Sequence, residues 1–63
     1  MPTVQIEMFE GRTLEQKRKL VKKVTEAIVE SIDTPSENVK IIIREMSREN
    51  YAAAGTLAID KQK

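Results

Sequence analysis

The feature that most constrains the fold is one long amphipathic segment, residues 14–32, lying between two segments with the pattern of β-strands. Thr13-Leu14-Glu15-Gln16 fits a capping box at its start, and Pro35 disfavours helical backbone just beyond its end. We therefore predict a single helix over about residues 14–32. The side chains expected on its packed face are Leu14, Lys17, Leu20, Val21, Val24, Ala27, Ile28, Ser31 and Ile32.

The two flanking segments predict strands of different character. Residues 3–9 alternate apolar and polar side chains, which is typical of a half-buried strand. Residues 39–46 are β-branched and apolar on both faces at their centre, as in an inner parallel strand. A strand, a helix and a second strand predict a βαβ unit of the α/β class, or α+β by some schemes. Residues 51–59 could add a short C-terminal hairpin.

The size of the chain predicts self-association. A chain of 63 residues is at most one domain, here residues 1–63, and it buries only roughly 60% of the surface that its unfolded form exposes. It has no cysteine for disulfides and no histidine, which excludes the usual zinc-binding patterns. Because small folds need some additional source of stability, we expect a homo-oligomer.

Charge and hydropathy exclude several classes of partner. Eleven Lys and Arg against ten Asp and Glu give a net charge of +1, far from the basic balance of nucleic-acid-binding domains. We find no signal-peptide pattern and no apolar run long enough to cross a membrane. The expectations are a cytoplasmic protein that binds neither nucleic acid nor a membrane.

Few groups in the chain can perform chemistry. With no His, no Cys and no glycine-rich phosphate loop, most hydrolase and redox functions are disfavoured. Pro2 has two interpretations: it is a residue tolerated at the start of a strand, or, once Met1 is removed, it is a free secondary amine. From its position alone, the structural interpretation is the simpler one.

Several motifs together resemble the 4-oxalocrotonate tautomerase family. They are Met1-Pro2, Glu10-Gly11-Arg12, Glu15-Gln16-Lys17, Pro35 and Glu45-Met46, in order across nearly the whole chain. The resemblance implies an isomerase that acts on 2-hydroxymuconate-like dicarboxylic dienols of aromatic hydrocarbon catabolism, without metal or other cofactor. It also implies dimers with a four-stranded sheet that assemble into a hexamer, a trimer of dimers.

The resemblance also assigns roles to individual residues. Pro2, freed by loss of Met1, becomes the catalytic base, and Arg12 binds a substrate carboxylate. Lys40 stands where the family has a second arginine, so it keeps the charge but loses the planar fork. Tyr51 replaces a phenylalanine of the active-site wall, and Phe9 is expected to contact the substrate.

The proposed base must have a lowered pKa. An α-amino group titrates near pH ~8, and a secondary amine is more basic, so Pro2 would be protonated at neutral pH. Desolvation and the nearby cations Arg12 and Lys40 would lower this pKa, as proton transfer requires. Because of the lysine at position 40, a tautomerase for another 2-oxo acid enol, such as an aryl pyruvate, is an alternative. A non-catalytic oligomeric module of the same fold is another.

Overall fold

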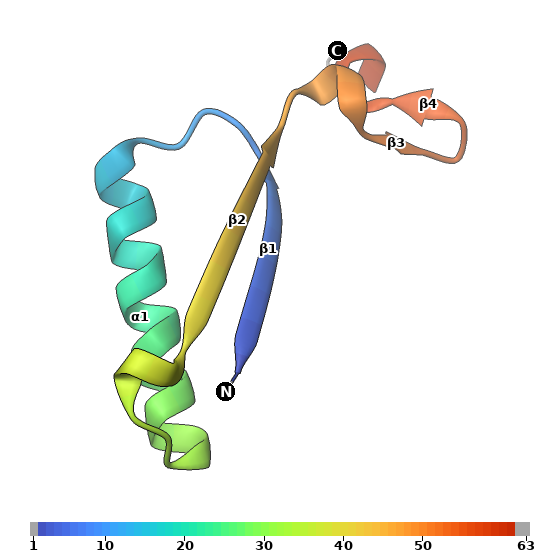
Figure 1. Cartoon of the computed structure of the whole chain (residues 1–63). Coiled ribbons are helices and arrows are strands. Elements are labelled where there is room, and N and C mark those ends of the chain that lie inside the picture. The colour runs from blue at the N-terminus through green and yellow to red at the C-terminus, as the bar shows by residue number, and fades with distance from the viewer. Residues whose placement is uncertain (1, 62–63) are drawn as a thin grey trace.

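A computed structural model describes residues 2–61 and confirms the predicted order of elements (Figure 1). Strand β1 spans Thr3–Phe9 and helix α1 spans Leu14–Ile32, as predicted. Strand β2 spans Lys40–Met46, one residue shorter than expected, because the Val39 N–H is bonded to Ser36 O in the preceding 3-10 turn. The remaining elements are the turns η1 (Ser36–Asn38), η2 (Arg48–Asn50) and η3 (Ala58–Lys61), and the hairpin strands β3 (Ala52–Ala53) and β4 (Thr56–Leu57).

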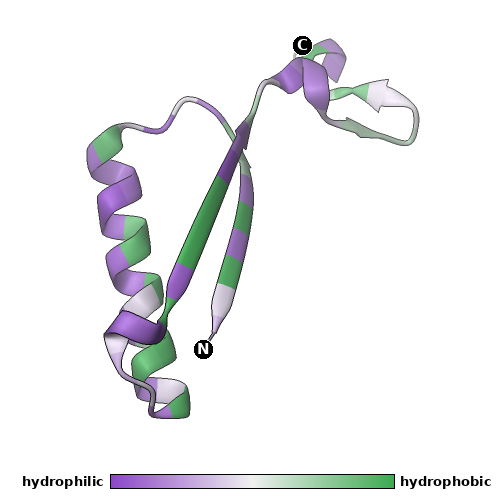
Figure 2. Cartoon of the chain, viewed as in Figure 1, coloured by the Kyte–Doolittle hydropathy of each residue, from purple (hydrophilic) through white to green (hydrophobic). Residues whose placement is uncertain are grey.

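The two long strands form a parallel pair that is packed on one face only. The register runs from Thr3 opposite Lys40 to Phe9 opposite Met46. Val4 and Ile6 of β1 lie opposite Ile41 and Ile43 of β2, and these four half-buried side chains share the face that α1 covers. Figure 2 shows the alternation as hydrophilic and hydrophobic bands along β1, whereas the centre of β2 is continuously hydrophobic.

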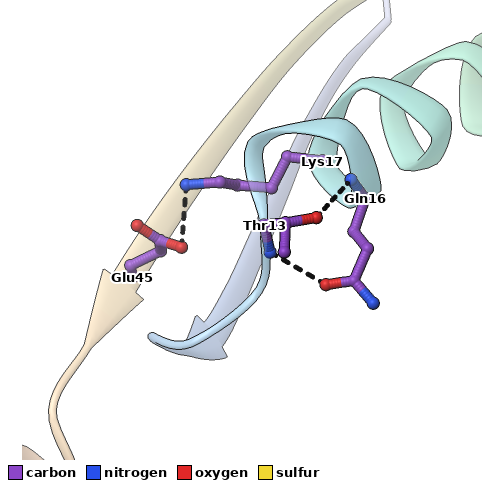
Figure 3. A network of polar contacts seen from close by, with 4 residues as sticks. All are labelled: Thr13, Gln16, Lys17 and Glu45. Atoms are coloured by element: carbon purple, nitrogen blue, oxygen red, sulfur yellow. Dashed lines mark hydrogen bonds and ion pairs between the residues drawn. The ribbon is translucent and has the colours of Figure 1, made fainter.

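The start of α1 is held by its own side chains and by an ion pair to the sheet. Thr13 Oγ1 accepts from the Gln16 N–H at 3.1 Å, and Gln16 Oε1 accepts from the Thr13 N–H at 2.8 Å, which confirms the capping box. One turn later, Lys17 Nζ lies 3.0 Å from Glu45 Oε2 on β2 (Figure 3). Because Glu45 has the same parity as Ile43, this pair also identifies the face of the sheet that α1 covers.

The far end of α1 is set by backbone geometry. Asp33 adopts a left-handed conformation with φ 58°, and its N–H donates to Val29 O at 3.1 Å. The helix therefore ends before Thr34, the residue that Pro35 restricts. The predicted packed face is covered only at its centre: Leu14 is 60% exposed and Ile32 59%.

The part of the protomer that the structure describes has no buried core. Among residues 2–61, no side chain is buried, and Ile42 on the open face of the sheet is 40% exposed. The radius of gyration is 15.0 Å, whereas a compact chain of this length would have one of about 11 Å. Residues 2–61 contain no helix with the length and hydropathy to cross a membrane. The exposed apolar side chains and the large radius of gyration are those expected of a subunit in an oligomer.

The C-terminal hairpin projects away from α1 and from the β1–β2 pair (Figure 1). Only two residue pairs join its strands, Ala52 with Leu57 and Ala53 with Thr56. Its loop residues, Ala54 and Gly55, both have positive φ, 54° and 80°. An alanine thus occupies a left-handed position that favours glycine.

Candidate active site

One end of the sheet brings Pro2 and Lys40 together. The Lys40 N–H donates to Pro2 O at 3.0 Å, so Pro2 extends the parallel ladder just before β1. The Lys40 ammonium donates to Glu37 O at 2.9 Å, in the turn that precedes β2. Pro2 is half-buried, while Met1, whose removal is predicted, lies outside the described residues. This end therefore holds a candidate base and a cation.

The opposite end of the sheet holds the aromatic residues. Phe9 and Tyr51 meet edge to face, with ring centroids 5.5 Å apart. Their rings border a hollow of about 300 Å³ whose other lining residues are Glu7, Met8 and Met46. The Glu10 N–H donates to Met46 O at 2.9 Å, which extends the strand pairing beyond Phe9. The predicted wall residue Tyr51 and the predicted substrate contact Phe9 thus lie together.

Arg12 lies at this second end, beside the start of α1. It follows Gly11, whose φ of 123° turns the chain away from β1, and precedes the capping residue Thr13. Arg12 is exposed and lines a hollow of about 290 Å³ with Met8, Gln16, Lys17 and Leu20. Within residues 2–61 it forms no ion pair, so its guanidinium is available to an anionic ligand.

The predicted site is divided between the two ends of the protomer. Pro2 precedes β1 and Lys40 is the first residue of β2, whereas Arg12 follows β1 and Tyr51 follows β2. The seven residues of β1, at about 3.3 Å each, separate the ends by roughly 20 Å. One protomer therefore does not bring Pro2 to Arg12 and Tyr51.

A further cation at the aromatic end was not predicted from the sequence. The Arg48 guanidinium carbon lies 4.2 Å from the centroid of the Phe9 ring. In the sequence, Arg48 is one charge in the polar turn Ser47 to Asn50, with no periodicity or motif to single it out.

Residues 2–61 contain no cluster of three or more His, Cys, Asp or Glu arranged to hold a metal ion.

Comparison with known proteins relates nearly the whole chain to tautomerases. A family model described as "Tautomerase enzyme" matches residues 2–61. A 2-hydroxymuconate tautomerase of Bacillus subtilis is 47% identical over 62 residues, which are 98% of this chain and 100% of that protein.

Solved structures agree with this relation. A 4-oxalocrotonate tautomerase isozyme of Methylibium petroleiphilum superposes with a TM-score of 0.93 at 41% identity, covering 97% of this chain and 95% of its own. A heterohexameric 4-oxalocrotonate tautomerase from Chloroflexus aurantiacus has a TM-score of 0.89 at 30% identity and covers 95% and 97%. The βαβ unit and its C-terminal hairpin are thus shared with these proteins.

Proposed function

The chain belongs to the tautomerase family and is an isomerase, and from that premise we propose that it ketonises a 2-hydroxydienoate, a dicarboxylic dienol like 2-hydroxymuconate, to its 2-oxo isomer. The observation that carries the proposal is the division of the site: a secondary-amine candidate with one cation at one end, and a second cation with an aromatic hollow at the other. A dicarboxylate needs cations at both of its ends.

Assembly of copies would complete the site. We propose that two protomers pair through their strands into a four-stranded sheet, and that three such dimers form a hexamer. The absence of buried side chains in residues 2–61 and the open sheet face around Ile42 support this, as does the heterohexameric relative. Pro2 of one copy then approaches Arg12 and Tyr51 of another.

In the proposed mechanism, Pro2 moves one proton. Loss of Met1 frees its nitrogen, which takes the proton of the 2-hydroxyl group as the electron pair shifts through the conjugated system. The same proton is then delivered to carbon 3 or carbon 5, so that no other reactant is required. Arg12 and Lys40 orient the carboxylates, and Phe9 with Tyr51 keeps water from the amine, which favours its neutral form.

The domain organisation, the location and the pathway expected from the sequence are part of the same proposal. Residues 1–63 act as one tautomerase domain in the cytoplasm, in the catabolism of aromatic hydrocarbons. A lysine at position 40 is compatible with other enols, because a point charge holds a carboxylate less specifically than a guanidinium fork. A tautomerase of an aryl pyruvate enol is therefore the second candidate.

The test is ultraviolet-monitored ketonisation of 2-hydroxymuconate by protein whose intact mass shows that Met1 is absent. We expect turnover, and a decrease of about 10²- to 10⁴-fold in kcat for Pro2→Ala, the range that positioned proton transfer contributes. Thr3→Ala, on the neighbouring residue, is the matched control and should keep kcat. Processed protein that ketonises phenylenolpyruvate instead would favour the second candidate, and protein that ketonises neither would refute both.

Substitution of Lys40 tests how the carboxylate is held. Lys40→Arg restores the fork, and we expect KM for 2-hydroxymuconate to fall about 3- to 10-fold, since each tenfold corresponds to about 1.4 kcal/mol. Lys40→Gln should raise KM by a similar factor or more. If KM is the same in both variants and in the parent protein, Lys40 does not contact the substrate.

A further inference from the structure

Arg48 occupies a defined position at the aromatic end of the sheet. Its guanidinium carbon is 4.2 Å from the centroid of Phe9, whose ring also meets Tyr51 and borders the 300 Å³ hollow. A guanidinium at this distance from an aromatic ring is attracted to the π-face. Stacking leaves the N–H groups around the edge of the guanidinium plane available as donors.

The turn that carries Arg48 is held by three hydrogen-bonding groups. Ser47 Oγ accepts from the Glu49 N–H at 3.0 Å, and Ser47 O accepts from the Asn50 N–H at 2.9 Å. Tyr51 O accepts from the Ala58 N–H at 2.8 Å, which ties the same segment to η3. Hydrogen bonds therefore hold the backbone on both sides of Arg48, which limits the conformational entropy that this turn loses when a ligand binds.

Its donors have no carboxylate partner in the described part of the chain. The ion pairs within residues 2–61 are Lys17 with Glu45 and Arg18 with Glu15. Arg48 is exposed and lines a hollow of about 510 Å³ together with Glu10 and Glu49, but it forms an ion pair with neither carboxylate. The 300 Å³ hollow shares the Phe9 ring with Arg48, which is not itself a lining residue, and its other lining residues are Tyr51, two methionines and Glu7.

We propose that Arg48 is a further substrate-binding residue of the proposed tautomerase site, and that its ring-stacked guanidinium binds one carboxylate of a dicarboxylate whose carbon chain lies against Phe9 and Tyr51. This rests on the proposed function. It adds a second planar guanidinium to that of Arg12 at the aromatic end, whereas the other end has the lysine ammonium of Lys40. Arg48 thereby determines the preference for dicarboxylic over monocarboxylic ligands.

The test measures binding without turnover. Adipate, a saturated six-carbon dicarboxylate, and hexanoate, its monocarboxylate counterpart, are titrated into the processed oligomer by calorimetry and by the emission of Tyr51. Tyr51 is the chain's one tyrosine and there is no tryptophan, so this emission reports on the proposed site. In the unsubstituted protein we expect adipate to bind more tightly than hexanoate.

Arg48→Met keeps an unbranched stem over Phe9 but removes the charge and the donors. We expect it to lower the ratio of adipate to hexanoate affinity at least fivefold, with Arg48→Lys intermediate. Arg18→Met, on a side chain of α1 that is 62% exposed, is the matched control and should leave the ratio unchanged. The mass of each oligomer is measured to confirm assembly.

The outcomes separate this proposal from the proposed function. If Arg48→Met weakens adipate and hexanoate equally, Arg48 only supports Phe9, and the proposal is overturned; it is likewise overturned if adipate does not bind the unsubstituted protein. Protein that binds adipate through Arg48 yet ketonises no dienol refutes the function and retains the site. Protein that ketonises 2-hydroxymuconate with an unchanged Arg48→Met ratio refutes the site alone.

Discussion

The βαβ unit and the C-terminal segment are stabilised in different ways. In the first, seven residue pairs join β1 to β2, α1 covers one face, and both ends of the helix are capped. In the second, two residue pairs join β3 to β4, and the exposed side chains include Tyr51, Leu57 and Ile59, at 50%, 38% and 43%. A hairpin of this size has marginal stability by itself in water.

The two regions differ in how far contacts within one protomer can stabilise them. The βαβ unit has its own hydrogen-bonded framework, but Ile42 on the open face of its sheet is exposed to solvent. The C-terminal segment has apolar side chains and few partners within the protomer. We infer that contacts between copies stabilise the C-terminal segment most, and that they also cover the open face of the sheet.

A charge on the open face of the sheet should have the largest effect on assembly. Ile42→Glu places a carboxylate at the face that assembly would bury, and an unpaired buried charge costs several kcal/mol. We expect loss of the oligomer, and with it loss of turnover, because Pro2 and Arg12 lie at opposite ends of each protomer. Sedimentation equilibrium and the ketonisation assay measure the two effects.

The control for this change is Ile42→Val, which keeps the face apolar and should cost about 0.5–1.5 kcal/mol without loss of the oligomer. All samples are compared at one protomer concentration, because the stability of an oligomer depends on it. An Ile42→Glu protein with unchanged mass and activity would show that this face stays in solvent, and would contradict the proposed assembly.

The βαβ unit was predictable because its signals are local. Alternation over Thr3 to Phe9 and the cap at Thr13 each depend on residues adjacent in the sequence, and the structure confirms both bounds. The end of the helix at Ile32 was also predicted, although the left-handed backbone conformation of Asp33, and not Pro35 alone, ends it. The exposure of Leu14 and Ile32 could not be predicted, because spacing shows which face a residue is on and not how far the sheet extends beneath it.

Loss of the helix cap should lower the stability of the βαβ unit by a smaller amount. Thr13→Ala removes the hydroxyl that accepts from the Gln16 N–H, and loss of such a cap costs about 1 kcal/mol. We expect this loss in the free energy of unfolding, measured by urea denaturation, with the oligomer intact. Thr13→Ser keeps the hydroxyl and should differ little from the parent; equal losses in both variants would mean that the cap does not stabilise α1.

The candidate site was predictable only in part, because its residues come from opposite ends of the fold. The resemblance to a family pointed to Pro2, Arg12 and Lys40, and these roles remain proposals. The parallel register explains why Pro2 and Lys40 are neighbours, since Lys40 begins β2 opposite Thr3 and Pro2 directly precedes Thr3. Arg48 could not be found in this way, because its contact with Phe9 joins residues 39 positions apart without a sequence pattern.

Substitutions in the loop of the C-terminal hairpin should change stability least. Ala54 has a φ of 54°, a left-handed conformation that costs a residue with a Cβ about 1–2 kcal/mol, whereas Ala53 lies in a strand. Ala54→Gly removes this strain but adds freedom to the unfolded chain, worth about 0.4–1 kcal/mol, so we expect a net gain of about 0.5 kcal/mol. Ala53→Gly gains nothing and should lose about 0.5–1 kcal/mol. The Ala58 N–H donates to Tyr51 O, and alternation along the antiparallel ladder makes Ala53 and Thr56 the next hydrogen-bonded pair. Slower exchange of the Thr56 and Ala58 amides in Ala54→Gly and faster exchange in Ala53→Gly would show that the hairpin has a stability of its own. Equal and negligible shifts would show that contacts between copies determine its conformation.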